Sequence, residues 1–332
     1  MQLRNPHDRR TLIWAVAMPL VTLVQYLRPS VLPFSLPLAC YLALSAGVIA
    51  HNHNHHPTFK ERRWNRLFSL WLAVFYGYPT FAWVPTHNQN HHRYVNRAGD
   101  ATITWRYSNR HNLAIAVSYF FVSSYWQSGP IKAYIANARA TAPNVYRQIV
   151  NEYVVWAGTA LALLGFSIAL HGLQTGLWIW LLASVVPAFF ALWTIMLFNY
   201  EQHVHADSSS EHSHSRSWDG RLVNFLLFNN GYHAAHHESP GLHWSALPQA
   251  HAALAPRIHP ALIERSLAWY FVKNYALAPF APRFGTRQIG PEPSAMNMTL
   301  RGPDVSLHRR AHDAAEGVDG AHANTPPSLC DG

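Results

Sequence analysis

The sequence predicts an all-α integral membrane fold, in which four transmembrane helices form two hairpins beside interfacial helices and a cytosolic cap rich in histidine. Three observations support this prediction: four long apolar runs nearly free of charge, short turns within each pair of runs, and histidine clusters close behind them. The mean hydropathy of -0.06 is low for a membrane protein, because polar stretches rich in His, Asn and Arg dilute the apolar runs.

The four apolar runs each approach the ~20 residues that a helix needs to cross the ~30 Å hydrocarbon core of a bilayer. They cover residues 11–27, 31–50, 153–170 and 177–200. The turn of the first pair is 28–30 and that of the second is 171–176. Turns this short force the helices on either side to be antiparallel neighbours, so we expect two helical hairpins.

Two further apolar stretches, 67–85 and 113–126, are less suited to crossing a membrane. The first is broken by Gly77, Tyr78 and Pro79, and the second is too short. We therefore expect both to lie at the membrane interface, as re-entrant or amphipathic helices beside the four spans. This arrangement keeps all the histidine clusters on one side of the membrane.

The basic residues indicate how the chain is oriented. With four spans, both termini and residues 52–152 share one side, which carries every Lys and Arg except Arg28. The positive-inside rule makes that side the cytoplasm, and we expect a bacterial inner membrane with the termini and active site cytoplasmic. The first ten residues are basic, but no small-residue cleavage site follows them, so we expect an uncleaved first span.

The formal net charge of +9 fits an anionic membrane surface better than a nucleic acid. The arginines are scattered and not gathered into a stripe with exposed aromatic residues, so we expect no nucleic-acid partner. We predict a membrane domain over 1–282. Residues 283–332 are poor in large apolar residues, and we predict a disordered tail without chemistry there.

The composition points to a metal held by histidine. With only 2 cysteines the chain cannot form a disulfide framework or a thiolate metal site, whereas its 23 histidines are a large excess. Imidazole is the commonest nitrogen ligand for borderline metals. No His-Glu-x-x-His sequence occurs, which argues against a zinc peptidase.

Three histidine clusters share similar spacing, and a fourth segment adds to them. The strings are HNHNHH over 51–56, HNQNHH over 87–92 and HAAHH over 233–237, while YEQHVH over 200–205 adds another imidazole. On a helix, residues three or four apart lie on one face, so each cluster can present several rings together. The ten predicted ligands are His51, His55, His56, His87, His91, His92, His203, His233, His236 and His237.

Other histidines are expected to take no part. His53 points away from the face that carries the ligands of its cluster, and His205 would be turned away by a ligand at His203. A polar loop holds His212 and His214, which we expect to be exposed. A short His-rich string can also be a solvated loop, but matched clusters on one side of a membrane favour joint ligation.

Nearby carboxylates could orient the ligand rings through hydrogen bonds to their second nitrogen. The alternative for each is an ordinary helix cap or surface charge. The candidates are Asp100, Glu201, Asp207, Asp219 and Glu238.

These clusters resemble the three histidine boxes of the membrane fatty acid desaturase family, in the forms HxxxHH, HxxxHH and HxxHH. The segments 91–100, 200–205 and 217–219 are also similar, and the resemblance covers roughly 40–255. It implies a non-haem di-iron oxidoreductase that uses two Fe ions and O2 to remove two hydrogens from a fatty acyl chain, giving a cis double bond. The ten histidines are then metal ligands, and no separate acid, base or nucleophile is required.

Several alternatives remain open at this stage. A fatty acid hydroxylase or a terminal-alkene-forming decarboxylase has the same boxes, and acyl chain length, carrier and oligomeric state do not follow from them. A histidine-rich metal transporter is disfavoured, because transporters place polar ligands near the middle of their spans.

The resemblance also implies a substrate tunnel and an electron donor. Aromatic residues over 71–83 and 189–198 could line an apolar tunnel for the acyl chain, although core or lipid packing is the commoner role of such residues. The sequence has no His-Pro-Gly-Gly haem signature, no cysteine set for an iron–sulfur cluster and no Gly-x-Gly-x-x-Gly fingerprint. A separate electron donor, such as a ferredoxin or a reductase, is therefore implied.

Overall fold

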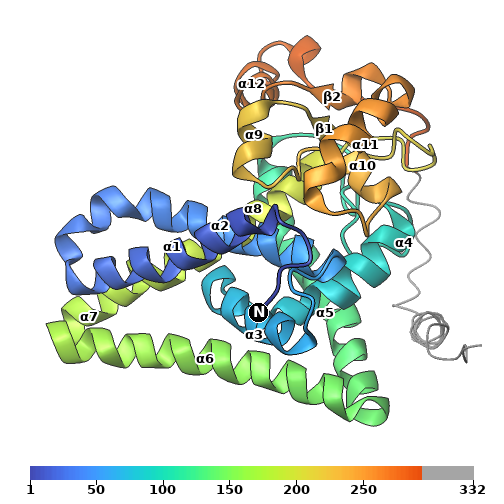
Figure 1. Ribbon diagram of the computed structural model, residues 1–332. Coiled ribbons are helices and arrows are strands. Elements are labelled where there is room, and N and C mark those ends of the chain that lie inside the picture. Colours follow the sequence, from blue (N-terminus) through green and yellow to red (C-terminus); the bar gives the residue numbers. More distant parts are fainter. Residues whose placement is uncertain (294–332) are drawn as a thin grey trace, which may run out of the picture. The chain divides into compact units, whose positions relative to one another are not determined.

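The computed structural model describes residues 1–293, which are mostly helical (Figure 1). Within this part of the chain, four helical segments are long and apolar enough to cross a membrane, which confirms the four predicted spans. They are α1 (Asp8–Leu27), Pro29–His55 with α2 (Leu32–His55), α6 (Pro143–His171), and Leu173–His203 with α7 (Leu173–Trp180) and α8 (Val186–His203).

Both hairpins have the short connections that the sequence predicts. The 3₁₀ turn Pro29–Val31 links α1 to α2, and Gly172, with a φ of 76°, links α6 to α7. A π-helical turn, Leu181–Val185, separates α7 from α8 within the fourth span. Because α2 and α8 continue beyond their apolar runs, each carries histidines past the end of the apolar segment.

The stretch predicted to be broken is bent by 97° between α3 (Arg62–Tyr76) and the segment Thr80–Tyr94. The second segment contains the 3₁₀ turn Thr80–Ala82, the π-helix Val84–His91 and α4 (His92–Tyr94). Gly77 ends α3 in the left-handed region, with a φ of 86°. The predicted break therefore lies where Gly77 and Pro79 stand, and it turns the second histidine cluster toward the others.

Replacing Gly77 with alanine is expected to destabilise the protein. An added Cβ would lie 2.3 Å from the Cβ of Ala188 on α8, and the positive φ alone costs about 1–2 kcal/mol for an L-residue. Thermal unfolding in detergent micelles should therefore show a lower midpoint for Gly77→Ala. Gly158→Ala is the matched control, because its Cβ would meet nothing within 4 Å; an equal loss in both variants would contradict the explanation.

The helix α5 (Leu113–Thr141) is longer than the predicted interfacial stretch, 113–126. It continues through Pro130 because the residues that follow are mostly good helix formers, such as Ala, Lys and Arg. It packs against both α6 and α8. One wall of the central cavity described below is consequently formed by α5.

Residues 204–293 form the histidine-rich cap, which consists of short elements (Figure 1, yellow to red). Two short parallel strands, β1 (Ser217–Trp218) and β2 (Ile263–Glu264), pair within it. Its helices are α9 (Arg221–Leu226), α10 (His233–Glu238), α11 (Leu247–Leu254) and α12 (Leu267–Phe271), with the π-helix Val272–Leu277 and 3₁₀ turns at Trp244–Ala246, Ala255–Arg257, Pro260–Leu262 and Pro282–Phe284. Fully buried Trp218, Phe228 and Tyr270 form its core and hold α10 in place.

The beginning of the predicted tail contacts the folded domain. The backbone N–H of Ile289 donates to the carbonyl of His205 at 2.8 Å, and Gln288 donates to the carbonyl of Ala206 at 3.1 Å. Residues 294–332 of the predicted tail lie outside the described residues.

Candidate metal centre

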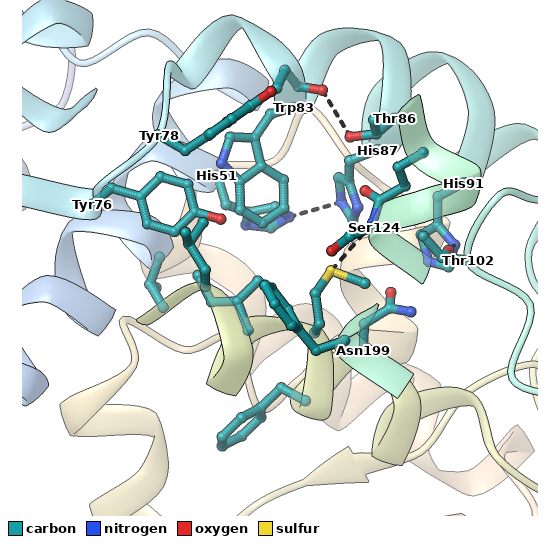
Figure 2. A pocket seen from close by; sticks show the side chains of 18 of the residues that line it. His51, Tyr76, Tyr78, Trp83, Thr86, His87, His91, Thr102, Ser124 and Asn199 are labelled. Carbon is teal, nitrogen blue, oxygen red and sulfur yellow. Dashed lines mark hydrogen bonds between the residues drawn. The ribbon is translucent and has the colours of Figure 1, made fainter. Parts of the chain in front are cut away.

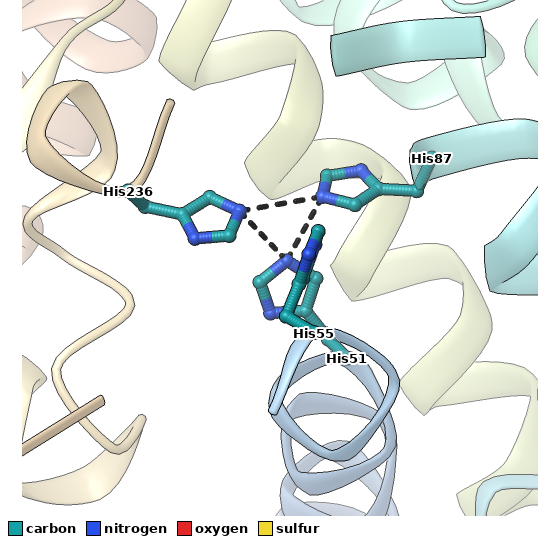
Figure 3. Close-up of side chains that lie close together, drawn as sticks. All are labelled: His51, His55, His87 and His236. Carbon is teal, nitrogen blue, oxygen red and sulfur yellow. Dashed lines mark hydrogen bonds between the residues drawn. The ribbon is translucent and has the colours of Figure 1, made fainter. Parts of the chain in front are cut away.

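Four histidines from three separate elements converge in a first group (Figure 3). The group consists of His51, His55, His87 and His236. The Nε2 atom of His51 lies 2.9 Å from that of His87 and 3.1 Å from that of His236, and the last two are 3.5 Å apart. The ring of His55 stands edge-on to those of His51 and His236. Four ring nitrogens therefore face one point.

A second group of four lies beside the first. It consists of His91, His203, His233 and His237. The Nε2 atom of His203 lies 3.1 Å from that of His91 and 2.9 Å from that of His233. The Nε2 atom of His237 is 3.0 Å from that of His233. The chain thus builds two similar clusters of imidazole nitrogens.

The nitrogens of each group are spaced like the ligands of a single ion. Imidazole nitrogens about 2.1 Å from an ion, at tetrahedral or octahedral angles, lie roughly 3.0–3.4 Å from one another. The observed separations fall between 2.9 and 3.5 Å. Hydrogen bonding alone is a poor explanation, because a neutral imidazole has one N–H while the same Nε2 atoms face several others. Each group could therefore hold one metal ion.

The ends of two spans supply histidines to the two groups because the helices continue past their apolar runs. His51 and His55 lie one turn apart on the last turns of α2 and face the first group together, as the four-residue spacing predicts. His203 is the last residue of α8 and faces the second group. Two distant parts of the chain are thereby fixed at one level of the helix bundle.

Two short helices each contribute to both groups. In the π-helix Val84–His91, His87 joins the first group and His91 the second, and their rings stack 5.2 Å apart. In α10, His233 and His237 face the second group while His236 faces the first. Because these helices straddle both groups, two bound ions would be close neighbours.

The structure brings nine of the ten predicted ligands together and places the tenth apart. His92 lies beside the first group, with its Nε2 atom 3.0 Å from those of His87 and His236. His56 belongs to neither group, and its ring lies 5.1 Å from that of His243. Metal ligation by any of these residues stays a prediction.

Burial keeps these imidazoles in the form that binds metals. It lowers the pKa of His233, His236 and His237 well below the usual value, and the neighbouring imidazoles lower it further. The rings are therefore neutral near pH 7, and a lone pair on each is free for a metal ion.

Two histidines that we expected to stay outside the centre, His53 and His205, do lie away from it, and so does His171. His53 is buried, with its Nδ1 atom 2.9 Å from the hydroxyl of Thr58. His205 faces the carbonyl of Asn109 at 2.6 Å, and His171 lies at the far end of α6.

The expectation that His214 is exposed is wrong. The ring is buried, and its backbone carbonyl lies 3.2 Å from the Nδ1 atom of His203. An Nδ1–H that donates to this carbonyl leaves the Nε2 lone pair of His203 directed at the second group. His212 is only half-buried and pairs with Glu238 at 2.7 Å. The polar loop therefore folds back over the site, which its composition did not indicate.

Asp100 is the one predicted carboxylate that contacts a ring of either group. Its Oδ2 atom lies 2.8 Å from the Nδ1 atom of His91, and Thr102 donates to its Oδ1 at 2.7 Å. Burial by itself would raise the pKa of this carboxyl, but His91 and the hydrogen bonds from Thr102 lower it to about 2. Thr102 also lies 3.0 Å from His91, a contact that no sequence signal marked.

The other four predicted carboxylates hydrogen-bond to no ring of either group within the described residues. Glu201 is fully buried and instead accepts from Tyr270 at 2.9 Å and from Tyr275, and lies 3.0 Å from His111. Of the remaining three, Asp207 accepts from the backbone N–H of Ser209 and Glu238 pairs with His212. Asp219 is half-buried.

Replacing Asp100 with asparagine is expected to weaken metal binding by about 10–100-fold, as is common when a carboxylate that orients a ligand is removed. The substitution preserves size but removes the charge that fixes the tautomer of His91. A chelator titration followed by metal analysis would measure the change. Asp219→Asn is the control; if both variants release metal alike, Asp100 does not orient His91.

An apolar cavity of about 400 Å³ lies against both histidine groups (Figure 2). His51 and His87 of the first group and His91 and His233 of the second line it. Its other walls come mainly from apolar and aromatic residues of α2, α5 and α8 and of the bent segment. Residues from both predicted tunnel stretches take part, including Tyr76, Tyr78, Trp83, Leu192 and Phe198.

The sequence profile described as fatty acid desaturase matches residues 28–269, which is most of the chain. The matched region includes all eight histidines of the two groups. No curated protein and no solved structure matches the chain significantly.

Proposed function

Because the chain belongs to the fatty acid desaturase family, we propose that it uses two iron ions and O2 to introduce a double bond into a fatty acyl chain. Family membership makes the protein an oxidoreductase. The observation that supports the proposal best is the apolar cavity whose wall includes rings of both histidine groups.

The ligand type suits the proposed metal. Neutral imidazoles bind iron and leave its positive charge largely uncompensated, which favours O2 chemistry. When bound, the two irons would supply the oxidant needed to break an unactivated C–H bond. The protein orients the rings through the Asp100 carboxylate and the carbonyl of His214.

The cavity positions the substrate and excludes water. Leu44, Val48 and Ile195 give it apolar walls, so an acyl chain can replace water there at little cost. His51 and His91 then lie at its surface, which brings the chain close to both groups. A chain held in this way keeps two adjacent carbons within reach of the centre, as removal of two hydrogens requires.

We place the two histidine groups on the cytoplasmic side, with a separate ferredoxin or reductase as electron donor. The ends of α1, α2 and α6 nearest the groups lie beside segments that contain several Lys or Arg residues, which supports this orientation.

Product analysis tests the reaction. The purified protein in lipid vesicles, with ferredoxin, its reductase and O2, should convert acyl chains into products two hydrogens lighter in mass spectra. A product one oxygen heavier would identify a hydroxylase, and a terminal alkene without the carboxyl carbon would identify a decarboxylase. Either result would replace the desaturase proposal while leaving the metal centre intact.

A further inference from the structure

Ser124 on α5 lies where a row of residues that line the cavity meets a row of residues that face outward. Residues at helical spacing in the first row line the cavity, namely Phe120, Ser124, Gln127 and Ile131. The neighbouring row faces outward, where Phe121 is 60% exposed and Tyr125 is 72% exposed. Ser124 belongs to both, because it lines the cavity (Figure 2) and is also exposed. At this point, therefore, only a small side chain stands between the cavity and the outward-facing residues of α5.

This wall lies beside a membrane span. α5 crosses α8 where Trp193 donates to the carbonyl of Val117 at 3.2 Å and where Phe120 packs against Phe189, with ring centroids 5.5 Å apart. Phe189 precedes His203 by almost four turns of α8, about 20 Å along the helix. The crossing thus lies within the fourth candidate span, which is long and apolar enough to cross a membrane.

The surface around Ser124 is apolar and aromatic. On α8, Phe189 is 49% exposed and Phe190 is 38% exposed, and Phe189 packs against Phe120, whose ring also contacts that of the exposed Phe121. Such a patch is unfavourable in water but natural against lipid chains. An acyl chain lying on it would meet the cavity at the position with the smallest side chain.

From these observations we infer that the substrate chain enters the cavity sideways from the bilayer, between α5 and α8 at Ser124. The inference rests on the proposed function and specifies its substrate class: an acyl chain already dissolved in the membrane, carried by a lipid or as a free fatty acid. Ser124 then determines access, and Phe120, which contacts both the cavity and Phe189, forms the edge of the opening.

Blocking the opening tests the inference. In lipid vesicles, Ser124→Trp should convert membrane acyl chains at least about tenfold more slowly than wild type, with unchanged iron content. Ser118→Trp is the matched control, because Ser118 is exposed on the same helix but does not line the cavity. Equal rates for Ser124→Trp and wild type would overturn the lateral opening. Vesicles containing either labelled phospholipid or labelled free fatty acid distinguish the two sources of the chain.

A second measurement does not depend on catalysis. p-Benzoylphenylalanine in place of Phe120 should crosslink to the acyl chain of a tritiated phospholipid or fatty acid on illumination. Adding Ser124→Trp should abolish this crosslink and adding Ser118→Trp should preserve it. A crosslink that persists in the Ser124→Trp variant would show that the chain enters elsewhere. Absence of any acyl product from wild type would instead count against the proposed function.

Discussion

Replacing His236 with alanine is expected to leave about one iron per chain and to abolish acyl-chain oxidation. His236 faces only the first group, where its Nε2 atom lies 3.1 Å from that of His51, so its loss removes a ligand from one ion. Loss of a ligand should cost more than the ~10–100-fold typical of a residue that only orients one. Iron analysis and Mössbauer spectra of the purified variant would measure the change.

Two further variants make this result specific. His203→Ala should remove the other ion, because His203 faces only the second group. His212→Ala should retain both irons and full activity, because His212 pairs with Glu238 outside the groups. If His236→Ala kept two irons, or if all three variants lost iron alike, two separate four-histidine sites would be ruled out.

The sequence predicts the spans and the convergence of histidines well because both depend on local periodicity and on topology. Residues four apart on a regular helix share a face, and His51 with His55 behaves in this way. The division of the second cluster between two groups could not be predicted. It depends on the π-helix that carries both His87 and His91, which the four-residue spacing in the sequence does not indicate.

The contacts that loop residues make could not be predicted from the sequence either. The helix α2 ends at His55, so His56 leaves the helical register and turns toward His243 of the cap. His214 stands in a polar loop that looks solvated, yet the loop is buried against α8. Neither outcome has a periodic signal, because each depends on which distant segment covers the residue.

Filling the cavity beside the first group, with Val48→Trp, is expected to abolish acyl-chain oxidation while both irons remain. Val48 is 7% exposed, lines the cavity and precedes His51 by about one turn of α2. The larger ring would occupy the space proposed for the acyl chain, at a cost of about 1–3 kcal/mol in stability from overpacking. Iron content, thermal unfolding and product formation would be measured together.

Leu38→Trp on the same helix is the control for this experiment, because Leu38 is 47% exposed and does not line the cavity. The comparison separates the two functions proposed for the end of α2, which are metal binding and substrate binding. His51 should still hold its ion in Val48→Trp, since the helix that carries it is unchanged, whereas the substrate loses its place next to that ion. Normal turnover in Val48→Trp would mean that the acyl chain lies elsewhere, even if both metal sites are as proposed.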